Sequence, residues 1–310
     1  KYEDWTRTQL IARLSQLDDD TGVARPRRKL GFDISSKPRR KIALKFCYHG
    51  WEYSGLELQK GHSVFPTVES VLEAALIGAR LIDPAGGLEG AELSKSGRTD
   101  RGVSAAGQVI SLWVRTTQHL LSTESEIPYA ATLNRLLPPS IRILSWSPVT
   151  SDFKARFACI GRHYKYFFRL HSGLDLGRMR DAAQRLEGTH DWRNFCKLDG
   201  SKGDVNYLRT VDLATIDHPA LYVINVRGLG FLYHQIRHIA AVLFLVGQGL
   251  EEPSIVTSLL NTDPANPIPP FRADEPPPAV LENKPVYEIA DPLPLVLWDT
   301  LYRDEDVRWQ

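Results

Sequence analysis

The stretch Lys41-Ile42-Ala43-Leu44-Lys45-Phe46-Cys47-Tyr48 opens the folded part of this sequence. Its larger apolar residues occupy every second position, which is the period of a β-strand with one buried face. Thr67 can then cap a helix whose apolar residues follow the 3.6-residue period, namely Val68, Val71, Leu72, Ala75, Leu76 and Ala79. A glycine-rich turn and a strand over Gln108–Val114 complete a strand–helix–strand unit.

The second half contains more strands than helices. We expect strands at Ile141–Trp146, His163–Leu170, Leu208–Ile216, Leu221–Arg227 and Pro294–Asp299. We expect helices at Asp175–Leu186, Gly230–Val246 and Ser254–Leu260, and an irregular proline-rich loop over Asn261–Pro278. Short separations between neighbouring strands favour antiparallel pairing. The predicted class is therefore α+β, with a mainly antiparallel central sheet of two pseudo-symmetric halves and helices packed on one side.

The bulk composition is that of a soluble globular protein. Of 310 residues, 43% are hydrophobic and 24% charged, and no apolar run is long enough to span a bilayer. The three cysteines have no regular spacing, so they suggest neither disulfides nor structural zinc, and a reducing compartment fits best. The start resembles neither a signal peptide nor a transit peptide, and its lack of Met suggests that targeting residues have been trimmed.

Residues 1–40 look like an N-terminal extension with a short helix at Trp5–Leu17 and an acidic run at Asp18–Asp20. Although the net charge is only +1, two basic clusters, Arg25–Lys29 and Lys37–Lys41, concentrate positive charge where phosphates could be met. A solvated linker or a localisation signal explains these clusters at least as well. We expect the rest to divide into residues 41–150, carrying a reactive acidic loop, and 151–310.

The loop Ser94–Gly107 combines small residues with both signs of charge and leads directly into a predicted strand. Its glycines allow tight turns and close approach of a ligand. Arg98 and Arg101 flank Asp100 and would favour its carboxylate form. On composition alone, a surface turn with a salt bridge is the more common structure for such a loop.

The predicted helix Gly230–Val246 is almost entirely apolar after Arg237, so we expect it to be buried. Burying the guanidinium of Arg237 beside this apolar helix is costly unless a carboxylate binds it, and Asp100 is one candidate. His234 and His238 are spaced as metal ligands can be, but neither an HExxH pattern nor a third ligand accompanies them. We therefore expect structural or RNA-facing histidines and no metal.

The strand Arg162–Arg169 alternates aromatic and basic residues. Its face of Tyr164, Tyr166 and Phe168 could belong to the core or could present a ring to an unstacked base. Both are compatible if Tyr164 is exposed at the strand's start and the other rings are buried.

Together these segments resemble the pseudouridine synthases of the family that modifies tRNA anticodon arms. Its Gly-Arg-Thr-Asp-x-Gly-Val signature is matched by Gly97–Val103, with Asp100 at the catalytic position. The resemblance covers about residues 41–300, and it continues through Leu133–Pro138, Phe153–Phe157, Tyr164–Tyr166 and Phe231–Arg237.

Further segments look most like the eukaryotic branch that modifies tRNA positions 38 and 39. They are Leu56–Gln59, Gly188–Asp199, Val242–Gly249 and Pro294–Trp298. Ser104 also agrees with this branch, because bacterial members more often carry His there. The connection from Arg169 to Leu174 is short for the branch.

The resemblance implies a catalytic site of Asp100, Tyr164 and Arg237. Asp100 would start the isomerisation, either by attacking the sugar or by removing its C2′ proton, while Tyr164 would pack against the uracil or guide proton transfer. Arg237 would pair with Asp100. The predicted substrate-binding residues are Arg98, which would hold the flipped-out nucleotide, together with Lys95, Thr99, Arg101 and His234.

The expected partner is tRNA, gripped by a homodimer, without a cofactor or a membrane, in the nucleus, the cytoplasm or both. Two alternatives stay open. One is a synthase of the same family acting on other tRNA uridines, such as positions 27 or 28. The other is a tRNA-binding or tRNA-folding protein without turnover.

Overall fold

The computed structural model describes residues 5, 6, 9, 13, 34, 36–59, 64–117, 125–198, 205–217 and 221–310. The predicted acidic run 18–20 and basic cluster 25–29 lie outside these residues, as does most of the predicted helix 5–17. The chain forms two compact units: residues 1–159 with 302–310 are unit 1, and residues 160–301 are unit 2. The division at 150/151 drawn from the sequence stays a prediction.

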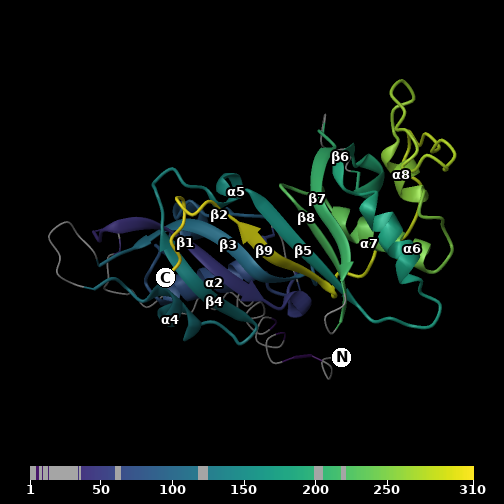
Figure 1. The fold of residues 1–310 in the computed structure, drawn as a ribbon. Coiled ribbons are helices and arrows are strands. Elements are labelled where there is room, and N and C mark those ends of the chain that lie inside the picture. Colours follow the sequence, from purple (N-terminus) through teal and green to yellow (C-terminus); the bar gives the residue numbers. More distant parts are fainter. Residues whose placement is uncertain are drawn as a thin grey trace. The chain divides into compact units, whose positions relative to one another are not determined.

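The described residues of unit 1 form four strands, in which β1 lies between β3 and β4, and β2 pairs with β3 (Figure 1). Their bounds are β1 Arg39–Tyr48, β2 Ser94–Lys95, β3 Ser104–Arg115 and β4 Ile141–Pro148. These pairings are antiparallel, as predicted.

The strand β1 is buried on both faces rather than on one. Ile42 and Leu44 are fully buried, and so is Ala43 on the opposite face. Ala43 belongs to a small apolar cluster with Val109, Phe153, Ala155 and Val307, which includes the C-terminal segment of the chain. The prediction of a single buried face was wrong because residues distant in sequence cover the second face.

The helix α2, Val68–Gly78, begins as the sequence predicted. The hydroxyl of Thr67 accepts a hydrogen bond from Ser70 N at 3.2 Å, and Ser70 Oγ accepts one from Thr67 N at 3.1 Å. This reciprocal capping satisfies backbone donors that would otherwise have no helical partner. The shorter helices of unit 1 are η1 Gly50–Glu52, α3 Gly87–Gly90, α4 Tyr129–Asn134 and α5 Ala155–Ala158.

In the part of unit 2 that the structure describes, five strands follow the order β9-β5-β8-β7-β6, again with antiparallel neighbours. Their bounds are β5 Gly161–Phe168, β6 Gly188–Asp191, β7 Leu208–Asp217, β8 Tyr222–Gly228 and β9 Leu295–Leu301. The helical elements of this unit are α6 Leu176–Gln184, η2 Arg193–Phe195, α7 Gln235–Gly247 and α8 Ile255–Leu260. The helix α6 packs against α7 and β7 (Figure 1). Both units thus combine helices with antiparallel strands, which confirms the α+β class.

The helix α7 begins five residues later than the predicted start at Gly230. His234 precedes it with a φ of 63°, in the left-handed region that a residue inside a helix cannot adopt. A turn is closed instead by Gln235, whose Oε1 accepts a hydrogen bond from Leu232 N at 2.8 Å. Residues 230–234 therefore form an irregular segment that leads into the helix.

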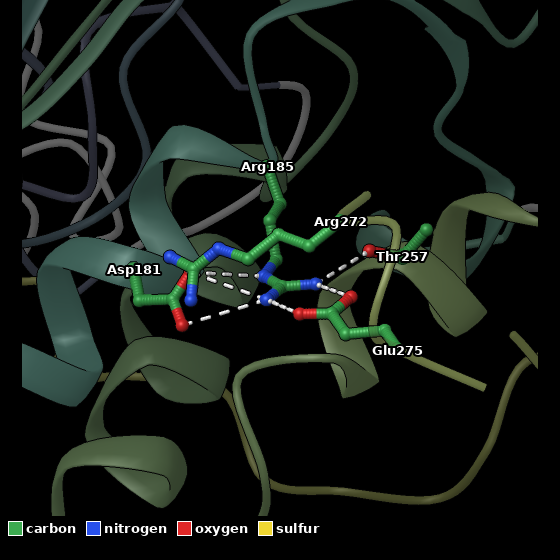
Figure 2. A network of polar contacts seen from close by, with 5 residues as sticks. All are labelled: Asp181, Arg185, Thr257, Arg272 and Glu275. Atoms are coloured by element: carbon green, nitrogen blue, oxygen red, sulfur yellow. Dashed lines mark hydrogen bonds and ion pairs between the residues drawn. The ribbon is translucent and has the colours of Figure 1, made fainter. Parts of the chain in front are cut away.

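The segment Asn261–Pro278 is irregular, as predicted, and a buried arginine fastens it to the unit. The guanidinium of Arg185 binds Asp181 at the end of α6, Thr257 in α8, and Glu275 in the segment (Figure 2). Arg272 adds a second link to Asp181 at 2.9 Å. Because the Arg185 side chain is only 1% exposed, these polar partners are needed to offset the loss of its hydration.

No helix within the described residues is long and apolar enough to cross a membrane.

Candidate active site

The predicted reactive loop connects β2 to β3 in unit 1, and its two ends are anchored by backbone and side-chain hydrogen bonds. Ser96 N donates to Val109 O at 2.8 Å, and the amide of the fully buried Gln108 donates to Gly97 O at 3.0 Å. Val103 N then donates to Asp100 O at 3.1 Å. Asp100 therefore stands at the start of a tight turn, half-buried, on an anchored backbone.

Two glycines allow another backbone segment to lie directly against this loop. A Cβ added to Gly50 would stand 2.0 Å from Val103 O, and one added to Gly55 would stand 3.0 Å from Thr99 O. Gly55 also has a φ of +94°, which disfavours any other residue. Substitution at either glycine would push the reactive loop out of place.

The side chain of Thr99 points into the protein. Its hydroxyl forms a hydrogen bond of 2.6 Å with Tyr48 Oη, and both residues are buried. This bond ties the residue next to Asp100 to the end of β1. The role of Thr99 in binding substrate stays a prediction, while the structure shows that it holds the loop.

The positive charges of the loop contact acidic and aromatic side chains. Lys95 Nζ lies 2.5 Å from Glu69 Oε1 and 3.0 Å from Glu57 Oε1. Arg98 Nε lies 2.7 Å from Glu57 Oε2, yet the Arg98 side chain remains 67% exposed. Arg98 is thus accessible to a polyanion, whereas Lys95 is more enclosed.

Arg101, which follows Asp100, places its guanidinium 5.0 Å from the centre of the Phe65 ring. Such a contact orients a cation through the ring's electron-rich face and leaves its charge in place. The substrate-binding roles predicted for Lys95, Arg98 and Arg101 stay predictions.

In unit 2, Tyr164 lies in the middle of the sheet, where β5 pairs with β8 and β9. It is only 8% exposed, because Phe231 covers it edge-on with ring centres 5.4 Å apart. The suggestion that Tyr164 is exposed at the strand's start was therefore wrong. Phe231 lies beyond β8 in the sequence, so strand periodicity could not place it over this ring.

Arg237 lies in the first turn of α7 and is half-buried. Its Nε donates to Ala290 O at 2.7 Å, and Ala290 N donates back to Arg237 O at 3.2 Å. The guanidinium is therefore oriented by a backbone carbonyl from a segment more than 50 residues away. Every residue has a backbone carbonyl, so the residue types in the sequence could not identify this partner.

Two histidines flank Arg237 on the chain. Burial, followed by the positive charges of Arg237, Lys197 and Lys284, lowers the pKa of His234 to about 4. Burial and then Lys284 lower the pKa of His238 to about 3. Both imidazoles are neutral near pH 7, so they can form hydrogen bonds but cannot act as phosphate-binding cations.

The two histidines also differ in exposure. His234 is half-buried with its ring 3.8 Å from that of Tyr233, whereas His238 is 3% exposed and structural. Binding of substrate by His234 stays a prediction. In the described part of the chain, no group of three or more His, Cys, Asp or Glu side chains could hold a metal ion.

The predicted catalytic residues thus come from both units. Asp100 is on the loop of unit 1, and Tyr164 and Arg237 are on β5 and α7 of unit 2. The pairing of Asp100 with Arg237 stays a prediction.

Comparison with known proteins places the chain in a family. A family model described as tRNA pseudouridine synthase matches residues 182–303. The chain is 37% identical over 343 residues to the tRNA pseudouridine(38/39) synthase of Saccharomyces cerevisiae, covering 100% of this chain and 73% of that protein. It is 38% identical over 321 residues to the protein of the same name in Bos taurus, covering 95% of this chain.

The match also extends to an archaeal protein. The tRNA pseudouridine synthase A of Methanothermobacter thermautotrophicus is 35% identical over 225 residues, covering 72% of this chain and 74% of that protein. The chain spans 62% of the length of the Bos taurus protein, less than two thirds of it. Identity over nearly the whole chain and over most of the yeast protein shows that this chain belongs to the tRNA pseudouridine synthase family.

Proposed function

We propose that this protein is a tRNA pseudouridine synthase that isomerises uridine in the anticodon stem-loop, at positions 38 and 39, with Asp100 as the catalytic residue. The observation that carries the proposal is the anchored turn that presents the half-buried Asp100. Identities of 37–38% to proteins named tRNA pseudouridine(38/39) synthase support the choice of positions.

The chemistry requires the bond from N1 of uracil to the sugar to break and a bond from C5 to form. Asp100 starts this exchange by attacking the sugar or by removing its C2′ proton. The bond to Asp100 is then broken again, or the C2′ proton is returned, while N1 of uracil takes up a proton and the C5 proton is released. Atoms and electrons balance within the nucleotide, so the proposed reaction needs no redox partner.

The other residues predicted for the site suit a uridine taken out of the RNA stack. Arg98 is exposed and can meet the flipped-out nucleotide or its phosphate once Glu57 is displaced. Tyr164 and Phe231 supply an aromatic wall, and Arg237 supplies a positive charge that favours the ionised form of a carboxylate.

We further propose a homodimer that binds one tRNA across both subunits, acting in the nucleus, the cytoplasm or both. Light scattering at micromolar concentration tests the first point, and a monomer would contradict it. Localisation of the tagged protein tests the second.

The decisive test is tritium release from tRNA carrying [5-³H]uridine. The wild type should release tritium, and Asp100→Ala should reduce release at least about a thousandfold, as expected for loss of a group that acts directly on the substrate. Equal release by both proteins would reject Asp100 as the catalytic residue. A wild type that binds tRNA without releasing tritium would favour the non-catalytic alternative.

Mapping of pseudouridine in treated tRNA tests the target. Modification at positions 38 and 39 is the expected result. Modification at 27 or 28 would keep the reaction and reject the proposed positions.

A further inference from the structure

Residues 284–290 in unit 2, here called the strap, run without helix or strand toward the start of α7. The strap ends at Ala290, which is joined to Arg237 twice, by its carbonyl to Arg237 Nε and by its amide to Arg237 O. The direction of the Arg237 guanidinium therefore depends on where the strap lies. Because the strap lacks a regular hydrogen-bond ladder, its position depends on side-chain anchors as well as on the two bonds at Ala290.

Lys284 is the first anchor. Its Nζ donates to Cys196 O at 2.7 Å and lies 3.0 Å from His238 Nε2. Cys196 and His238 are buried, and burial lowers the pKa of Lys284. An ammonium group beside a neutral imidazole makes Nε2 the acceptor of this hydrogen bond, so Lys284 also fixes the ring orientation of His238, one residue after Arg237.

Tyr287 is the second anchor. Its hydroxyl donates to Asn194 O at 2.6 Å, and its ring meets that of His238 edge-on with centres 5.2 Å apart. Asn194 is fully buried in η2 and is held in turn by the carbonyls of Leu259 and Leu281. The two anchors thus attach the strap to η2 and α7 at points that scarcely touch solvent.

The polar character of this region is costly. Asn194 Oδ1, Gln235 Nε2 and His238 Nδ1 are buried without a hydrogen-bond partner among the described residues. Unsatisfied buried groups reduce stability, and apolar side chains of similar shape would avoid that cost. The rest of α7 is almost entirely apolar, so the polar cluster is confined to the end of the helix that carries Arg237.

We propose that Lys284 and Tyr287 are positioning residues for the isomerisation: by anchoring the strap, they hold the Ala290 carbonyl where it directs the guanidinium of Arg237. This inference rests on the proposed function for its catalytic consequence. The positioning itself depends only on contacts within unit 2.

The first test separates kcat from KM for pseudouridine formation in tRNA. Lys284→Met should lower kcat about tenfold and Tyr287→Phe about fivefold, with KM within about twofold, since a displaced catalytic group slows chemistry more than binding. Lys284→Arg retains a donor for Cys196 O and should recover most of the loss. An unchanged kcat in both Lys284→Met and Tyr287→Phe would overturn the proposal.

A matched variant controls for general loss of stability. Glu275→Gln weakens the buried Arg185 network of the same unit, which has no contact with the strap anchors in the interactions described above. It should lower the thermal midpoint and leave kcat unchanged. An equal fall in kcat from Glu275→Gln and Lys284→Met at matched loss of stability would reject a specific positioning role.

A coupling experiment asks whether Tyr287 acts through Arg237. In an Arg237→Lys background, Tyr287→Phe should lower kcat by less than about twofold, because the group that it positions has already been changed. Fully additive effects would contradict the inference.

A measurement without turnover separates this inference from the proposed function. The Nε–H proton of Arg237, identified in NMR spectra by its loss in Arg237→Lys, should exchange with solvent slowly in the wild type and at least about tenfold faster in Lys284→Met. The Nε–H of Arg185 should keep its rate. An unchanged Arg237 rate would overturn the inference whatever the activity, whereas an altered rate in a protein that forms no pseudouridine would reject only the proposed function.

Discussion

Two arginines of unit 2, Arg185 and Arg237, have opposite surroundings. Arg185 is buried and is bonded to the carboxylates of Asp181 and Glu275 (Figure 2). Arg237 is half-buried and is oriented by the backbone carbonyl of Ala290. Carboxylates neutralise a guanidinium, whereas a carbonyl directs it and leaves its full charge to act elsewhere. Arg185 therefore suits a structural clamp, and Arg237 suits a site that must hold a carboxylate in its ionised form.

The largest effect should come from removing the clamp. Arg185→Met removes the cation shared by Asp181 and Glu275, leaving Asp181 only its contact with Arg272, and should lower the free energy of unfolding by about 3 kcal/mol. Urea denaturation measures this value. Arg169→Met, at an exposed arginine just after β5, is the matched control and should change stability by less than about 0.5 kcal/mol. Similar losses of stability in the two variants would contradict the structural role of Arg185.

Arg237→Met should show the reverse pattern. We expect kcat for tRNA to fall about 100-fold, as when a preorganised charge or donor is removed from a catalytic site. The free energy of unfolding should change by less than about 1 kcal/mol, because no buried carboxylate of unit 2 depends on Arg237 in the contacts described above. Steady-state kinetics and denaturation of the same preparation give both numbers. A stable variant with full kcat would show that Arg237 has no catalytic role.

The surroundings of Arg237 and of Arg185 should also lose stability in different pH ranges. The lowered pKa of His238, about 3 in the folded protein, means that only the unfolded chain takes up this proton between its ordinary value of 6.5 and 3. The contribution of His238 to the free energy of unfolding should therefore be fully present above pH 6.5. Below that pH it should fall by up to about 1.4 kcal/mol per pH unit. The titratable and charged groups that face it are Lys284, His234 and Arg237.

His238→Gln tests this assignment, because an amide oxygen can still accept a hydrogen bond from Lys284. Denaturation between pH 7 and 5 should show a shallower loss of stability in the variant. In the clamp region, the hydrogen bond from Arg185 lowers the pKa of Glu275. The Glu275 carboxylate therefore contributes to the free energy of unfolding above pH 4.5, which is about its pKa in the unfolded chain, and this contribution is lost only below that pH. An identical slope in wild type and His238→Gln would contradict the buried neutral imidazole.

The smallest effect concerns Arg98, an exposed arginine paired with Glu57 in unit 1. Glu57→Gln should change stability by no more than about 0.5 kcal/mol, as exposed ion pairs usually do. It should strengthen tRNA binding and steepen its salt dependence, because Arg98 no longer has to leave a carboxylate to meet a phosphate. Affinity measured at several salt concentrations checks this. Weaker binding by the variant would show that the pair presents Arg98 instead of restraining it.

Local chemistry allowed several elements to be predicted from sequence. Thr67 caps α2 through its own hydroxyl, as predicted. A helix was also predicted from Asp175, and in the structure Asp175 caps α6 by accepting hydrogen bonds from Gly177 N and Arg178 N. The prolines of segment 261–278 exclude regular structure. Short connections correctly predicted antiparallel pairing. These features depend on residues close together in the chain.

The errors arose where distant residues meet or where the backbone leaves its regular conformation. The burial of Tyr164 depends on Phe231, and the burial of Ala43 on the opposite face of β1 depends on Phe153 and Val307. The late start of α7 depends on the left-handed conformation of His234, which a helical apolar pattern does not reveal.

By itself, the sequence determined the α+β class, the family resemblance and the choice of Asp100 as the predicted catalytic residue, because motifs and caps are short-range patterns of residue type. Only the tertiary structure showed that Thr99 binds Tyr48, that Glu57 holds Arg98, and that a strap carbonyl orients Arg237. Those contacts join segments far apart in the chain, and one of the partners is a backbone group. Such a group is common to every residue, so only its position in the fold gives it a specific role.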